Sequence, residues 1–296
     1  MRRLVGPASF LLAITLIFTT GCGRASASEL PMRDRIENVD EIVASIRHGL
    51  KNHARTITIS FSYGSDIFHE LNGVIDAWVE AALAETDDPS EGDYLRCQYG
   101  GYTYSSSYVE RDSRFVYTVK LTPRYYCYLS QEEQASERAN ELLQSFGFRA
   151  RTPELERIRT IYDWICQNVR YDKVHHKNPY YHLGSTAYAA LVLKNATCQG
   201  YCVSLYRLLR EAGIDCRVVT GTASDGEGAE LHAWVIAEVD GLWYNLDPTW
   251  DAGAEEYRFF LVGEKDFVDH IPGERFAAEK FRAAHPMAED SYDLSE

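Results

Sequence analysis

The spacing of apolar residues predicts a small α/β unit in the first half of the chain. Residues 39–50 and residues 67–79 each carry apolar side chains at helical spacing, which predicts two amphipathic helices. Between them, residues 56–62 alternate polar and apolar positions strictly, as a half-buried strand does. Helix and strand patterns in this order indicate a separate α/β unit.

A tyrosine-rich hairpin is predicted to follow, over residues 96–127. If its turn is centred on Arg111 and Asp112, Cys97 and Cys127 fall within one residue of being opposite each other. Two cysteines so placed are close enough for a disulfide in an oxidising compartment. We therefore name them as a candidate disulfide.

Two further helices frame a domain boundary. One is predicted to end near Gly147, and Thr152-Pro153 opens the next, because proline is favoured at the first helical position. The sequence thus predicts an N-terminal α/β domain over residues 34–150 and a second domain over residues 151–296.

The second domain contains a predicted helix with a cysteine at its start. Thr197 is a good N-cap, and apolar residues recur at helical spacing over residues 203–212 before Gly213 ends the helix. Cys198 therefore stands at a helix N-terminus, where the helix dipole and unpaired N–H groups favour a thiolate. A thiolate is the form that attacks carbonyl carbon.

Two predicted strands carry a histidine and a carboxylate. They are joined by Asp240-Gly241, which is a strong signal for a two-residue hairpin turn. With that turn, Trp234 lies opposite Asp247, and His232 becomes the diagonal neighbour of Asp247 on the same face. The carboxylate can then accept from one imidazole nitrogen and leave the other to pair with a thiol, as in an activated nucleophile. A turn shifted by one residue would put the two groups on opposite faces.

Four stretches of the second domain resemble the transglutaminase-like superfamily of papain-type thiol enzymes, especially its bacterial exported members. They are RIRTIYDWICQNVRYD, STAYAALVLKNATCQGYCVSLYRLLREAGIDCRVVTGTA, LHAWVIAEVDGLWYNLDPTWD and YRFFLVGEKDF, in the family's order. The resemblance implies an α+β fold with a papain-like transglutaminase core, in which the cysteine helix packs on an antiparallel sheet. It also implies that Cys198 is the nucleophile, that His232 is general base and then acid, and that Asp247 orients the histidine.

Two positions depart from the family's pattern. Tyr162 stands where many relatives have a histidine, and Cys202 stands where a small residue is usual. Neither change removes a member of the triad. By analogy with the family, the oxyanion would be held by the backbone N–H of Cys198 and by Tyr188.

The predicted chemistry is acyl transfer at an amide carbonyl through a thioester on the cysteine. With water as the second nucleophile, the protein is a cysteine peptidase or amidase, which we expect to act on protein or envelope peptides. With an amine, it is a crosslinking protein-glutamine transglutaminase. A member that keeps the fold without the chemistry would be a binding module at the cell surface. The sequence leaves these alternatives open.

Other chemistries have weaker support. Cys198, Cys202, Cys216 and His232 are candidate zinc ligands, but no second close pair of cysteines or histidines completes a tetrahedral site. The sequence has no glycine-rich phosphate loop, HExxH motif or calcium loop. We therefore predict no metal and no cofactor. Asp251 is the rival carboxylate, and its place just beyond the strand favours an end-of-strand polar role.

The first residues resemble a bacterial secretory signal. Two arginines precede an apolar stretch that is too short for a membrane span, and residues 1–22 end in Thr-Thr-Gly-Cys. This ending is similar to a lipobox, which implies lipidation of Cys22 and a tether over residues 23–33. Cleavage after residue 27 is the alternative and would release a soluble protein. In either case we expect the protein outside the cytoplasm.

Net charge bears on the partners. The formal charge is −14 at pH 7, and it deepens when the two arginines of the signal are removed. Such a charge argues against binding to nucleic acid and against electrostatic binding to anionic lipid. We expect a protein or peptide substrate, and a membrane contact only through the lipid anchor.

Overall fold

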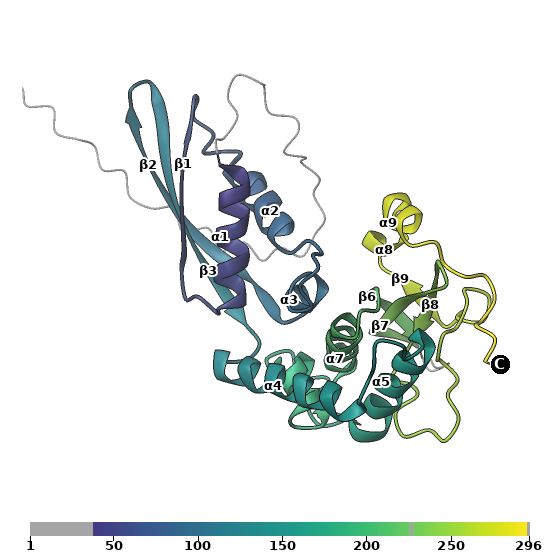
Figure 1. The fold of residues 1–296 in the computed structure, drawn as a ribbon. Coiled ribbons are helices and arrows are strands. Elements are labelled where there is room, and N and C mark those ends of the chain that lie inside the picture. Colours follow the sequence, from purple (N-terminus) through teal and green to yellow (C-terminus); the bar gives the residue numbers. More distant parts are fainter. Residues whose placement is uncertain (1–37, 225, 227, 295–296) are drawn as a thin grey trace, which may run out of the picture. The chain divides into compact units, whose positions relative to one another are not determined.

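The computed structural model describes residues 38–224, 226 and 228–294 (Figure 1). The predicted signal, tether and Cys22 lie outside these residues. Helices are combined with a three-stranded and a four-stranded sheet, which confirms the predicted α+β class. Packing divides the described chain into two compact units, one of residues 38–84 and 100–125 and the other of residues 85–99 and 126–294.

The smaller unit is a three-stranded sheet with two helices on it. Its elements are α1 (Val39–Lys51), β1 (Ile57–Tyr63), α2 (Leu71–Ala82), β2 (Tyr99–Arg111) and β3 (Arg114–Tyr125). The strand order is β1-β3-β2. Alternate residues of β1 are buried, as its polar and apolar pattern predicts. On that buried face, Trp78 of α2 packs edge-on against Phe61, with ring centroids 5.0 Å apart.

The hairpin of β2 and β3 turns one position later than predicted. Asp112 and Ser113 form the turn, and both have positive φ. Cys97 does not lie on a strand at all, because it is the last residue of the short helix α3 (Asp93–Cys97). Cys97 and Cys127 are both free thiols. The structure therefore contradicts the predicted disulfide. That prediction required Cys97 and Cys127 to face each other across two strands, and Cys97 lies on a helix.

The larger unit packs one buried helix between other helices and a sheet. Its elements after α3 are α4 (Leu129–Phe146), α5 (Glu154–Asn168), β4 (Arg170–Tyr171), the 3₁₀ turn η2 (Leu183–Ser185), α6 (Ala187–Leu191), β5 (Asn195–Ala196), α7 (Cys198–Glu211), β6 (Cys216–Ser224), β7 (Ala229–Val239), β8 (Leu242–Leu246), β9 (His270–Pro272), α8 (Glu274–Ala277) and α9 (Glu279–Ala284). The sheet has the order β8-β7-β6-β9, and neighbouring strands are antiparallel. Residues 200–209 of α7 are buried without interruption. This helix contacts β7 as well as α5 and α6, as the predicted papain-like core requires.

The units divide at a different place from the boundary predicted near residue 150. Helix α4 and residues 85–99 pack with the larger unit, whose core includes Tyr94 and Leu142. An ion pair explains part of this packing. The buried Asp93 carboxylate accepts two hydrogen bonds from the Arg217 guanidinium, at 2.8 and 3.1 Å, and so joins α3 to β6.

Candidate active site

Cys198 is the first residue of α7, as the sequence predicts. Thr197 is the N-cap residue, but its side chain does not cap the helix; its hydroxyl lies 3.3 Å from the carbonyl oxygen of Gly184. The backbone N–H of Thr197 donates to the same oxygen at 2.9 Å. The start of α7 is thus fixed to the turn before α6, and the N–H of Cys198, in the first helical position, has no acceptor within the helix.

Close backbone packing fixes the first turn of α7. A Cβ atom on Gly200 would lie 2.4 Å from the carbonyl oxygen of Gly184 and 2.9 Å from the Cβ atom of Ala196. No larger residue fits there without a shift of the backbone. The sequence CQGYC therefore places a glycine where the helix approaches its neighbours most closely.

The β7–β8 hairpin has the predicted register. Asp240 and Gly241 form the turn, with φ of 55° and 83°, and Val239 pairs with Leu242. Continued along the strands, this register places Trp234 opposite Asp247. His232 is therefore the diagonal neighbour of Asp247. The side chains meet as expected: Nε2 of His232 lies 2.8 Å from Oδ2 of Asp247.

Asp247 is completely buried and uses both carboxylate oxygens. Oδ1 accepts from the backbone N–H groups of Thr249 and Trp250, at 2.9 and 3.2 Å, and so forms the turn that follows the strand. Oδ2 accepts from His232 and, at 3.1 Å, from Nε2 of His270. Burial raises the pKa of Asp247, but the bonds and charges of the two histidines outweigh it and hold the pKa below its usual value.

His232 is held between the carboxylate and the thiol. Burial lowers its pKa, but hydrogen bonds to Asp247 and Cys198, together with their charges, raise the pKa of His232 to about 10. Because Nε2 faces Asp247, Nδ1 is the nitrogen left for the thiol. The structure thus brings together all three residues that the sequence singled out.

These shifts define the pH range in which the pair is charged. Because the pKa of His232 is raised, protonation of this residue stabilises the folded state. The contribution is complete when the pH is below 6.5, the ordinary pKa of histidine, and it is lost as the pH rises towards about 10. The lowered pKa of Asp247 contributes stability above its ordinary value of 3.8, and this is lost on acidification. Both groups are therefore charged at neutral pH.

The rival carboxylate, Asp251, has the end-of-strand role that its position predicts. Its side chain accepts from the backbone N–H groups of Arg258 and Phe259, at 2.9 and 3.0 Å, and so closes the loop between them. It also accepts from the buried hydroxyl of Tyr162 at 2.7 Å. The tyrosine that replaces the histidine of many relatives thus bonds to a structural carboxylate.

Two tyrosines are candidates for contact with the reacting group. Tyr188 lies on α6, half-buried beside the core that holds α7, and its part in an oxyanion hole stays a prediction. Sequence reasoning missed Tyr171, the last residue of β4. Burial and then the charges of Cys198 and Glu230 raise the pKa of Tyr171 to about 12, so its hydroxyl keeps its proton near the thiol. Tyr171 pairs with Ala196, two residues before Cys198, and no local sequence pattern signals this pairing of two short strands.

The other described cysteines differ from Cys198 in their surroundings. Burial raises the pKa of Cys127 to about 12, and it also raises the pKa of Cys166, Cys202 and Cys216. Such thiols are poor nucleophiles. Cys198 is partly exposed and interacts with a histidine.

His232, Asp247 and His270 also form a group that has the residue types of a metal site. Two ligands of a tetrahedral zinc ion, each about 2.0–2.1 Å from the metal, lie roughly 3.3 Å apart. The distance of 2.8 Å between His232 and Asp247 is instead that of a direct hydrogen bond, with a proton between the atoms. We interpret the group as a hydrogen-bonded cluster.

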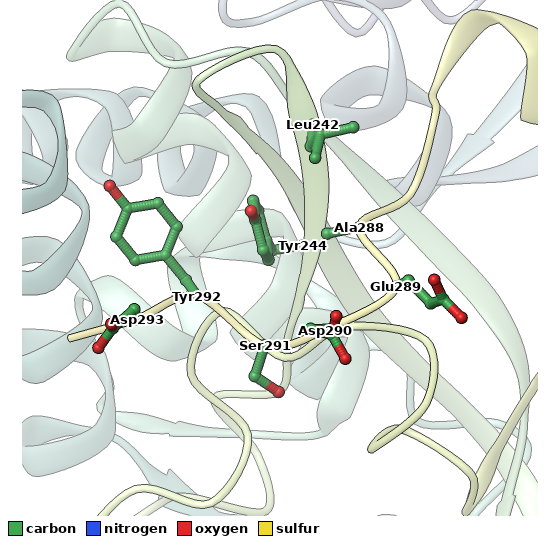
Figure 2. Close-up of a pocket in the computed structure, with 8 residues that line it drawn as sticks. All are labelled: Leu242, Tyr244, Ala288, Glu289, Asp290, Ser291, Tyr292 and Asp293. Atoms are coloured by element: carbon green, nitrogen blue, oxygen red, sulfur yellow. The ribbon is translucent and has the colours of Figure 1, made fainter. Parts of the chain in front are cut away.

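Two surface hollows differ in their relation to this cluster. One, of about 480 Å³, is lined by Leu242, Tyr244 and residues 288–293, and none of the three site residues lines it (Figure 2). The other, of about 380 Å³, is lined by Gln199, which follows Cys198 directly, and by Thr220, which pairs with the residue after His232. The second hollow thus lies beside sequence neighbours of the site, but Cys198, His232 and Asp247 do not line it.

Comparison with known proteins identifies the segment that holds these residues. Residues 141–248, which include Cys198, His232 and Asp247, match the family model of the transglutaminase-like superfamily. This segment is thus similar to that superfamily. The transglutaminase-like segment confirms the resemblance that the sequence motifs predicted.

Relatives of the chain include a peptidase. Kyphoscoliosis peptidase of Mus musculus is 30% identical over 143 residues, which are 44% of this chain and 21% of the relative. The chain thus spans about a fifth of the length of this curated relative.

Among solved structures, a TGase shares 18% identity over 51% of this chain and 45% of its own, with a TM-score of 0.37. A candidate cysteine protease from Cytophaga hutchinsonii shares 15% identity over 59% and 69%, with a TM-score of 0.35.

We predict that His232 stays protonated at neutral pH and titrates near pH 10. An NMR titration of the imidazole resonances measures this. Asp247→Asn and Cys198→Ala should each lower the pKa of His232, because each removes a group that raises it. His285, whose pKa is lowered by burial, serves as a reference in the same spectrum. Titration of His232 at or below 6.5 in the wild type would contradict the ion-paired site.

Proposed function

We propose that this protein is a thiol enzyme that performs acyl transfer at amide bonds, most simply as a cysteine peptidase or amidase on proteins or envelope peptides. One observation carries the proposal. A histidine whose Nε2 is bonded to a buried carboxylate interacts with a cysteine at the first position of a helix. This is the arrangement that activates a thiol nucleophile.

The reaction follows from these positions. The sulfur of Cys198 attacks the amide carbonyl carbon, and the bond from that carbon to nitrogen breaks. His232, protonated at neutral pH, donates its proton to the departing amine, which leaves a thioester on the cysteine. His232 then takes a proton from water as the water attacks the thioester. The products are a carboxylic acid and the restored thiolate beside protonated His232, and Asp247 keeps the imidazole oriented throughout.

The name of a relative supports a peptide substrate. The relative from Mus musculus is named a peptidase, and it is 30% identical to this chain over 143 residues. The acidic net charge gives no support to a nucleic-acid substrate.

We also propose an extracytoplasmic location with a lipid anchor on Cys22. The support is the sequence of residues 1–22, with its paired arginines, short apolar stretch and lipobox-like ending. In the described part of the chain, no helix has the length and apolar character that a membrane crossing requires.

The reactivity of the Cys198 thiol tests whether the protein is a thiol enzyme. Iodoacetamide should label Cys198 at neutral pH faster than the buried Cys202 and Cys216, read by peptide mass spectrometry in the same digest. His232→Ala should remove this advantage and lower amide turnover by about 10²–10⁴-fold, since it removes the acid and base. Labelling of Cys198 as slow as that of Cys202 in the wild type would favour the binding module.

With an active enzyme, added primary amine distinguishes the two reactions: a crosslinked product indicates a transglutaminase, and a free acid indicates hydrolysis.

The oxyanion assignment is tested by Tyr188→Phe beside Tyr171→Phe. If the Tyr188 hydroxyl holds the oxyanion, its loss should lower kcat by about 10²–10³-fold. Alkylation of Cys198 should not change, because alkylation forms no oxyanion. An intact kcat in Tyr188→Phe would show that assignment to be wrong, and a loss confined to Tyr171→Phe would transfer the role to Tyr171.

The anchor is tested by expression in a bacterial host with labelled fatty acid. The wild type should incorporate the label and sediment with membranes, and Cys22→Ala should lose both properties. A soluble, unlabelled wild-type protein that begins after residue 27 would instead support ordinary signal cleavage.

A further inference from the structure

His270 shares the carboxylate of the proposed triad, although no sequence motif pointed to it. It opens the short strand β9, and its side chain is fully buried. Its Nε2 lies 3.1 Å from Oδ2 of Asp247, the same oxygen that accepts from His232. Two imidazoles thus meet at one carboxylate oxygen.

Aromatic side chains fix the plane of the His270 ring. Phe267 stacks on it, with centroids 3.9 Å apart and planes 17° from parallel. Trp250 and Trp234 lie at 4.5 and 5.2 Å on other sides. A ring enclosed in this way cannot turn without a rearrangement of its neighbours. The direction of its Nε2 is therefore fixed.

Within the described residues, one nitrogen of His270 has a polar partner and the other has none. Nδ1 is buried and has no hydrogen-bond partner in the described part of the structure, whereas Nε2 points at a carboxylate. A carboxylate is an acceptor, so the proton of His270 lies on Nε2. An apolar residue would fill an aromatic cage without leaving a polar atom unpaired. The bond to Asp247 is thus what the histidine adds at this position.

A glycine brings His270 to this place. Gly221 of β6 pairs with Pro272 of β9, and a Cβ atom on it would lie 2.1 Å from the carbonyl oxygen of Ile271. Gly221 also pairs with His232 on its other side. The close approach of β9 to β6, which a side chain would prevent, therefore brings His270 beside His232, with ring centroids 5.4 Å apart and both Nε2 atoms at Oδ2 of Asp247.

We propose that His270 is a positioning residue that holds the Asp247 carboxylate so that its Oδ2 faces His232. It does not touch the reacting atoms, since the thiol interacts with His232. The backbone N–H groups fix Oδ1, and His270 supplies the second donor at Oδ2. This role rests on the proposed function, because it concerns the orientation of the proposed base.

The test compares His270→Gln, which keeps an N–H donor, with His270→Met, which has a similar reach and no donor. By analogy with other groups that orient a histidine, His270→Met should slow iodoacetamide labelling of Cys198 at neutral pH by about 10–100-fold. It should also lower the pKa of His232 in an NMR titration. His270→Gln should restore most of both properties. Unfolding curves show whether each variant is folded.

His285→Met is the matched control. His285 is also packed against aromatic rings and lines the same cavity of about 140 Å³ as His270, but it bonds to the carbonyl oxygen of Phe281. Its loss should leave labelling of Cys198 unchanged. A folded His270→Met variant with the labelling rate and the His232 titration of the wild type would overturn the role.

A measurement on the wild type keeps the test decisive if His270→Met does not fold. The ¹⁵N NMR spectrum should show the His270 proton on Nε2, and a proton on Nδ1 instead would overturn the proposal. None of these readouts requires turnover. If labelling depends on His270 but no amide is cleaved or transferred, the proposed function fails and the positioning role stands.

Discussion

The larger unit is organised around one buried negative charge. Transfer of a carboxylate from water into a protein interior is unfavourable by several kcal/mol unless hydrogen bonds and opposite charges compensate it. Asp247 is fully buried and accepts four hydrogen bonds, from two backbone N–H groups and two imidazoles. Its four lone-pair directions are therefore all used. Movement of any segment that supplies a donor would leave part of this charge unpaired.

This requirement ties together segments that are distant in sequence. His232 comes from β7, the two N–H groups come from the turn after β8, and His270 comes from β9. The thiol is added by α7, which contacts β7 and whose first turn is fixed by the close contact at Gly200. The geometry of the site is thus a product of sheet register on one side and helix packing on the other. Neither alone would bring an imidazole between a carboxylate and a thiol.

The parts of this site that the sequence predicted are those set by local rules. The turn at Asp240-Gly241 fixes the register of its hairpin, and period-two alternation then places His232 beside Asp247. The same argument failed for Cys97, because a helix, and not a strand, begins the segment there. His270 was missed for a different reason. It lies 23 residues beyond Asp247, and its place depends on the pairing of β9 with β6 across a long loop, which no local pattern encodes.

Two carboxylates four residues apart show how surroundings assign their roles. Burial raises the pKa of both Asp247 and Asp251, but only Asp247 has imidazoles that reverse the shift. Asp251 bonds to a tyrosine hydroxyl and to backbone N–H groups, and the charge of Asp247 raises its pKa further. A carboxylate that orients a protonated histidine must itself stay ionised. Asp247, with its two imidazoles, meets this condition, whereas Asp251 closes a loop. The histidines, and not the spacing of the two acids, therefore determine which carboxylate serves the thiol.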